Sequence, residues 1–177
     1  MLVLRSHLIF RTASSLSAAG DLYSSMSVQR SCAETSAYAL VLARDDQALD
    51  KWMARTDSDD TKKEARNSFI HSKIIKIIRK DDVDLEKTYD TIYQRSIDFG
   101  AHPNSSGIFT STEIERKDGN THIKQAGLHG PGTQFTLGLK STSQVGVFLI
   151  RICELIWPER VQLLSLYDEL WALRQSC

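Results

Sequence analysis

The sequence has few residues that break helices or crosslink chains. Three prolines and nine glycines occur among its 177 residues, which leaves long segments able to form helices. Its three cysteines, Cys32, Cys153 and Cys177, include no CxxC pair and no spacing typical of zinc ligands. This odd number argues against a disulfide framework and favours a reducing, cytoplasmic location.

An excess of charge and a long apolar run are also missing. Lys plus Arg and Asp plus Glu both number 22, so the summed charge gives no general reason to expect binding to nucleic acid or an anionic membrane. Nor is there an apolar run of about eighteen residues, as a membrane-spanning helix requires. The chain length predicts a single domain, residues 1–177.

Several common active-site motifs are absent as well. The sequence contains no phosphate-binding glycine loop, no GxSxG nucleophile motif, and no HxxxH or HExxH pair for a metal. We therefore predict neither a metal site nor a cofactor.

Apolar residues at helical spacing are what the sequence does contain. Residues 28–43 have apolar side chains at every angle around the helix, which predicts a buried central helix. Other predicted helices span about 3–26, with Gly20 as a weak point, 61–80 after a capping box of Thr61 and Glu64, 83–99, 133–156, and a last one starting at Pro158. Residues 1–20, rich in serine and arginine without acids, also fit an organellar targeting segment.

Between residues 107 and 127 the apolar period changes from about 3.6 to 2. Asp118-Gly119 lies at the middle of this segment and suits the positive φ angles of a type I′ turn. The predicted fold class is therefore mainly α, a single-domain bundle of six or seven helices with one inserted β-hairpin at 107–127.

One charge pair lies within the predicted central helix. Arg30 and Glu34 are the charged residues of 28–43, and one helical turn separates them. Burial would make each charge costly alone, so we expect a buried pair. It either fixes the helix structurally, which we favour, or belongs to a ligand site. Tyr38, one turn further, and Asn104 complete this candidate binding set.

A second group of polar residues lies in the stretch RSIDFGAHPN, residues 95–104. Gly100 is typical of the position just past a helix, and Pro103 disfavours a helical His102. We therefore expect the helix to end near Phe99 and His102 to lie on a turn.

Arg95 and His102 have a spacing that resembles the Arg-x6-His motif of the HEPN superfamily, whose members are helical bundles. The layout of residues 28–104 is also similar to bacterial helical proteins of this kind. The resemblance implies a metal-independent endoribonuclease, in which Arg95 binds the scissile phosphate of RNA and His102 transfers a proton.

Two hypotheses for function follow. The favoured one is a non-catalytic binding domain, which holds a small ligand near Arg30, Glu34 and His102 or forms a homodimer. Gly138, Thr142 and Gly146, at four-residue intervals, would allow close packing on a partner helix, or on a helix of the same chain. The alternative is the ribonuclease, with RNA as its partner.

Overall fold

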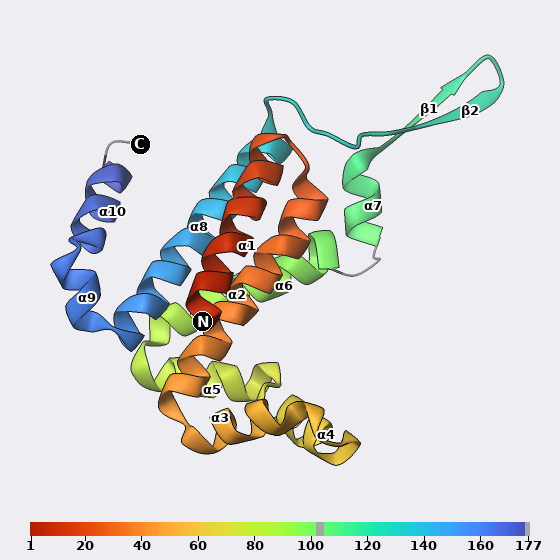
Figure 1. Cartoon of the computed structure of the whole chain (residues 1–177). Coiled ribbons are helices and arrows are strands. Elements are labelled where there is room, and N and C mark those ends of the chain that lie inside the picture. The colour runs from red at the N-terminus through yellow and green to blue at the C-terminus, as the bar shows by residue number, and fades with distance from the viewer. Residues whose placement is uncertain (102–104, 176–177) are drawn as a thin grey trace.

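The computed structural model describes residues 1–101 and 105–175 of a mainly helical protein with one β-hairpin (Figure 1). The predicted fold class is confirmed. Its body consists of α1 (Leu2–Ala18), α2 (Leu22–Arg44), α6 (Val83–Ser96) and α8 (Thr133–Ile156). None of the helices in the described part of the chain is long and apolar enough to cross a membrane.

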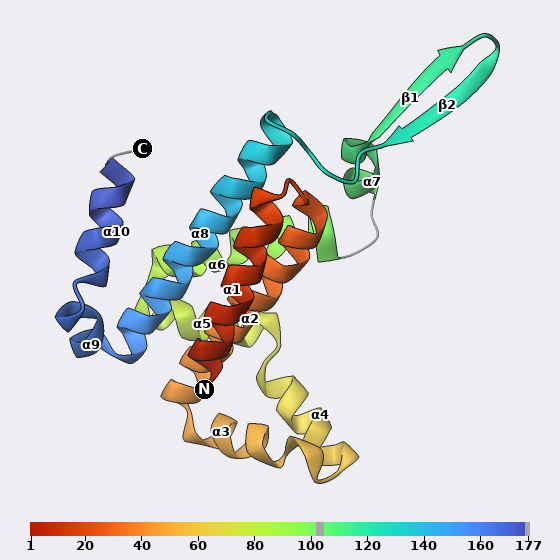
Figure 2. The same cartoon turned by 45° about the horizontal axis from the view of Figure 1, so that its top comes forward.

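The chain reverses between α1 and α2, where we had predicted one helix over 3–26. Gly20 has φ 81°, and Asp21 caps α2 by accepting a hydrogen bond from Ser24 N at 3.1 Å. The Gly20 carbonyl also accepts a bond from the backbone N–H of His129 at 2.9 Å. As a result α1 and α2 lie side by side (Figures 1 and 2).

Helix α2 is the central helix, as predicted. It contacts α1, α3, α5, α6 and α8. The buried apolar core gathers around it and includes Ala33, Ala37, Leu40 and Val41 of α2, Ile74 and Ile78 of α5, Tyr89 and Ile92 of α6, and Val145, Phe148 and Ile152 of α8.

The core also contains a hydrogen-bonded polar network between α1, α2 and α8. The amide of Gln29 donates to Ser25 Oγ and Thr142 Oγ1, both at 2.8 Å, and accepts from Ser141 Oγ at 2.6 Å. Ser17 Oγ lies 2.5 Å from Ser25 Oγ and 2.7 Å from Thr142 Oγ1. All five side chains are buried, so this network satisfies polar groups that water cannot reach.

The small residues of α8 pack within this chain. A methyl group at Gly146 would lie 2.9 Å from the Phe10 ring of α1, and one at Gly138 would lie 3.5 Å from Leu22. The four-residue stripe that predicted close helix packing is therefore covered by α1 and α2. The predicted bounds of α8 are confirmed, although Leu139, which its apolar side chain would favour for the core, is exposed.

The charged middle of the chain forms several short helices. They are α3 (Asp46–Met53), a 3-10 turn (Ala54–Thr56), α4 (Asp59–Ser68) and α5 (His71–Asp81). The predicted single helix over 61–80 is wrong in where it starts and in being continuous. Ser58 caps α4 in a capping box with Thr61, and the chain bends at Phe69 and Ile70. The bend lets Phe69 bury its ring on Tyr38 while Ile74 and Ile78 enter the core.

Helix α6 continues as a π-helical turn, Ile97–Ala101. We had predicted that the helix ends near Phe99 with Gly100 just past its end, but Gly100 lies within this π-helical turn and has no positive φ angle. Its lack of a side chain serves close packing instead. A Cβ atom there would lie 2.7 Å from Tyr23 O and 2.9 Å from Ser27 N of α2.

The hairpin consists of β1 (Thr112–Lys117) and β2 (Asn120–Gln125), with Ile114 opposite Ile123. Positive φ angles at Asp118 (53°) and Gly119 (76°) agree with the predicted turn. The predicted range of 107–127 is too long, since 107–111 belong to α7 (Ser105–Ser111). Figures 1 and 2 show the hairpin projecting away from the helices.

After α8 the chain continues into α9 (Pro158–Leu163) and α10 (Leu166–Gln175). The predicted last helix is interrupted at Ser165, which has φ 50°. Among the apolar residues of this segment, Val161 is buried, whereas Leu164 and Trp171 are more than half exposed.

Candidate functional site

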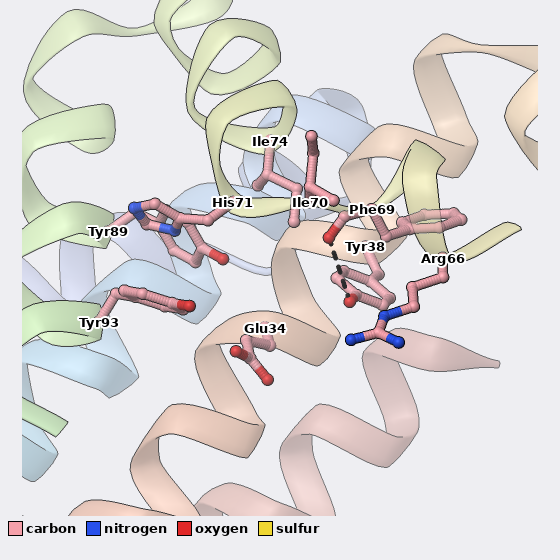
Figure 3. A pocket seen from close by; sticks show the side chains of 9 residues that line it. All are labelled: Glu34, Tyr38, Arg66, Phe69, Ile70, His71, Ile74, Tyr89 and Tyr93. Atoms are coloured by element: carbon pink, nitrogen blue, oxygen red, sulfur yellow. Dashed lines mark hydrogen bonds between the residues drawn. The ribbon is translucent and has the colours of Figure 1, made fainter. Parts of the chain in front are cut away.

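A solvent-open pocket of about 390 Å³ lies between α2, α6 and the bend from α4 to α5 (Figure 3). Its lining contains a carboxylate, a guanidinium group, an imidazole and several aromatic rings. These belong to Glu34 and Tyr38 of α2, Arg66, Phe69 and Ile70 at the bend, His71 and Ile74 of α5, and Tyr89 and Tyr93 of α6.

Helical spacing and the bend together build the pocket. Glu34 and Tyr38 are four residues apart on α2, as are Tyr89 and Tyr93 on α6, so each pair projects from one face of its helix. The bend at Phe69 and Ile70 turns the chain between Arg66 and His71 and places both at the same pocket.

The predicted pair of Arg30 and Glu34 is formed at this pocket. Arg30 Nε lies 2.9 Å from Glu34 Oε1, and the guanidinium carbon lies 4.5 Å from the centre of the Tyr93 ring. Burial lowers the pKa of Arg30, but the hydrogen bond and charge of Glu34 outweigh it, and the pKa is raised overall. The side chains are 20% and 33% exposed, so the pair is half-buried. We had predicted a buried pair, but here α2 borders the pocket.

Tyr89 brings an unpaired hydroxyl group to the pocket. Its side chain is completely buried, and its hydroxyl has no hydrogen-bond partner in the described part of the chain. Figure 3 shows this hydroxyl directed toward the space above Glu34. Burial raises the pKa of Tyr89, and the charge of Glu34 raises it further. The phenol therefore stays protonated, as a hydrogen-bond donor without an acceptor.

His71 contributes a second buried polar atom without a partner among the described residues, Nδ1. Its Nε2 atom lies 3.0 Å from Asp90 Oδ1, and its ring stacks on Tyr93 with 3.8 Å between ring centres. When Nε2 carries the hydrogen that is donated to Asp90, Nδ1 is an acceptor. The pocket then combines a hydrogen-bond donor, the Tyr89 hydroxyl, with an acceptor, His71 Nδ1, neither of which has a partner among the described residues.

Tyr38 lies on the other side of Glu34, and its hydroxyl donates to Phe69 O at 3.4 Å. Burial raises its pKa, as does the negative charge of Glu34, whereas Arg30 and Arg55 lower it. The positive charge of Arg55 therefore acts on this side of the pocket. Arg55 and Arg66 are both exposed, and neither has an ion pair within residues 1–101 and 105–175.

Arg95, the predicted phosphate ligand, lies apart from the pocket lining. Its Nη1 donates to Ser141 Oγ and its Nη2 donates to Gln144 Oε1, both at 2.8 Å. Burial lowers its pKa. His102 and Asn104 lie outside the described residues, so the pairing of Arg95 with His102 and the role of Asn104 stay predictions.

The described residues contain no group of three or more His, Cys, Asp or Glu side chains arranged to hold a metal ion. The pocket lining also includes no serine or cysteine next to a base. What the lining offers is hydrogen bonding, charge and aromatic surface, which suit ligand binding.

Sequence reasoning identified Glu34 and Tyr38 and missed most of the opposite wall. Tyr89 and Tyr93 have the helical spacing of core residues, and His71 and Arg66 were each assigned to one face of a continuous helix. The missing signal was the bend at Phe69 and Ile70, which brings them together.

Comparisons with protein-family models, with curated proteins and with solved structures found no match for this chain. We therefore infer function from site geometry alone.

Proposed function

We propose that the protein is a binding domain for a small organic molecule, held in the pocket between Glu34, Tyr38 and Tyr89. The observation that carries this proposal is the buried Tyr89 hydroxyl without an acceptor. A buried polar group without a partner costs about 1–3 kcal/mol. A ligand that accepts a hydrogen bond from Tyr89 recovers that free energy, so it gains affinity from a group that is already in place.

Two further features support binding. Pockets for small molecules usually measure roughly 300–1,000 Å³ and combine apolar and aromatic surface with a few convergent polar groups. The volume of about 390 Å³ falls in that range, and Phe69, Ile70 and Ile74 supply apolar surface beside Glu34 and Tyr89.

The test is a thermal-shift screen of small polar and aromatic compounds, followed by titration of each hit against Tyr89→Phe. This substitution removes the hydroxyl and keeps the ring, so we expect a folded protein that binds the hits roughly tenfold more weakly, the effect of about 1.4 kcal/mol.

Tyr23→Phe is the matched control, because the Tyr23 hydroxyl is also buried without a described partner but does not line the pocket. It should leave the affinity for each hit unchanged. A screen without hits, or hits that Tyr89→Phe binds as tightly as wild type, would contradict the proposal.

The ribonuclease is a second candidate, favoured by the chemistry of Arg95. Its guanidinium group donates to two neutral side chains, and no carboxylate pairs with it in the described residues. Its positive charge is therefore left for an anion such as phosphate.

The ribonuclease is tested by incubating a mixed RNA pool with purified protein in EDTA, beside the double variant Arg95→Ala, His102→Ala. Cleavage that the folded double variant lacks supports the ribonuclease. Absence of cleavage by wild-type protein excludes it for that pool.

A further inference from the structure

The charges around the pocket are unevenly neutralised. Glu34 is paired with Arg30 at 2.9 Å, and Asp90 lies 3.0 Å from His71. Arg66 lines the pocket without an ion pair in the described structure, and Arg55 acts on Tyr38 through its charge. Both acids therefore have partners, while two arginines do not. The charge left for a ligand to neutralise is positive.

The polar groups that a ligand could contact lie on different sides of the pocket. Figure 3 shows the Arg66 guanidinium group beyond Tyr38, the Glu34 carboxylate below the centre, and the Tyr89 hydroxyl toward α6. Glu34 Oε1 already accepts from Arg30, and the second carboxylate oxygen can accept another bond. A ligand that fills this space meets an acceptor at Glu34, a donor at Tyr89 and a cation at Arg66.

The apolar and aromatic side chains of the pocket determine which kind of ligand framework fits. Ile70 and Ile74 lie on the side opposite Glu34, and the rings of Tyr38 and Phe69, tilted at 35° with centres 4.4 Å apart, separate them from Arg66 (Figure 3). Flat aromatic surfaces bury well against such side chains because they lose little conformational freedom. The size of the pocket also limits the ligand to a few ring systems.

We infer that the ligand is a small aromatic or heteroaromatic organic anion. Its acidic group, a carboxylate or a phosphate, pairs with Arg66. Its ring lies against Tyr38, Ile70 and Ile74, and its polar edge donates to Glu34 and accepts from Tyr89. This inference rests on the proposed function and adds the chemical class of the ligand.

The test uses matched pairs of probes that differ in the acidic group. One arm compares nucleoside monophosphates with the corresponding nucleosides, and the other compares aromatic carboxylates such as 4-aminobenzoate with their amides. Titrations are followed by calorimetry and by the methyl NMR signals of Ile70 and Ile74. In at least one arm we expect the acid to bind with at least about tenfold higher affinity than its neutral partner. A difference of this size is typical of a charge-assisted hydrogen bond. The arm that binds identifies carboxylate or phosphate.

Arg66→Gln should weaken that acid about three- to tenfold, because the ion pair is partly exposed to water. It should leave the neutral partner unaffected. Lys63→Gln removes one positive charge from the exposed surface of the same helix, outside the pocket lining, and should change neither affinity by more than about twofold.

The outcomes separate the two proposals. If neutral partners bind at Ile70 and Ile74 as tightly as the acids, or if Arg66→Gln and Lys63→Gln weaken the acids equally, the assignment of an anion to Arg66 is wrong while the binding pocket stands. If no acid or neutral partner shifts the Ile70 and Ile74 signals, the anion assignment is also wrong. If the compound screen also yields no hits, the proposed binding function is wrong too.

Discussion

At the scale of single residues, Gly100 shows how closely the π-helical turn after α6 approaches α2. A Cβ atom at this position would lie 2.7 Å from Tyr23 O and 2.8 Å from Met26 Cβ. Backbone atoms cannot move aside as the end of a flexible side chain can. The hydroxyl of Ser27 also donates to Gly100 O at 2.7 Å, which keeps the two segments together.

We predict that Gly100→Ala lowers the free energy of unfolding by about 1–3 kcal/mol, the usual cost of forcing a methyl group into a packed interior. Urea unfolding measures this change. Gly127→Ala is the control, because a Cβ at Gly127 would meet no atom within 4 Å and its φ angle is not positive. Equal stability of the two variants would mean that the π-helical turn after α6 does not approach α2 this closely.

At the scale of secondary-structure elements, Asp82 holds the start of α6. One carboxylate oxygen accepts from the backbone N–H groups of Asp84 and Leu85, both at 2.9 Å. The other accepts from Arg151 of α8 at 2.8 Å. Burial raises the pKa of Asp82, but the bond from Arg151 and the two backbone bonds outweigh it, and the pKa is lowered overall.

A lowered pKa in the folded state has a definite consequence for stability. The ionised carboxylate stabilises the folded protein above the pKa of the unfolded chain, and this contribution is lost as the pH falls through the folded-state pKa. Asp82→Asn, which can still cap the helix, should lower the free energy of unfolding by about 1 kcal/mol at neutral pH.

Urea unfolding over a series of pH values should show that the difference in stability between wild type and Asp82→Asn closes as the pH falls below the ordinary pKa range of an aspartate carboxyl. Asp84→Asn is the control, because the Asp84 side chain is 90% exposed. It should change stability much less. A gap that persists unchanged into strong acid would show that the charge of Asp82 contributes nothing.

Local chemical signals account for the elements that sequence reasoning predicted well. Asp118-Gly119 defines the hairpin turn, and the apolar pattern of α8 persists across its whole length. The bend at Phe69 and the break at Ser165 have no comparable local signal. Phe69 leaves the helix because its ring packs on Tyr38, 31 residues earlier in the chain. The pocket depends on this bend, so sequence reasoning found Glu34 and Tyr38 without their opposite wall.

At the scale of the whole molecule, the hairpin stands apart from the helical core. Ile114 and Ile123 are 57% and 70% exposed, and Ala126 N donates to Ser111 O at 2.8 Å where the hairpin meets α7. Its two ends are therefore close enough to be joined by a short linker. Isolated two-stranded hairpins are marginally stable at best, so this one contributes little to the stability of the body.

We predict that replacing residues 112–125 by a short glycine-serine linker changes the free energy of unfolding of the helical body by less than about 0.5 kcal/mol. Circular dichroism of the helices during urea unfolding checks this. A larger loss of stability would show that the hairpin packs on the body.

The expected homodimer stays a prediction, and the edges of the hairpin are a surface on which a strand of another protomer could pair. Sedimentation of the intact protein and of the shortened variant at matched concentrations tests it. If the hairpin mediates self-association, the intact protein sediments as a dimer and the shortened variant as a monomer.

The polar network around Gln29 has a consequence for the pocket. Apolar helix faces can slide along one another by a turn and bury nearly the same area, but hydrogen bonds between fixed atoms allow one alignment. Gln29 bonds to Ser141 and Thr142 of α8, and it precedes Glu34 on α2 by five residues. Arg95 of α6 bonds to the same Ser141. One serine hydroxyl thus sets the axial position of both α2 and α6 against α8, and with it the spacing between the two walls that carry Glu34 and Tyr89.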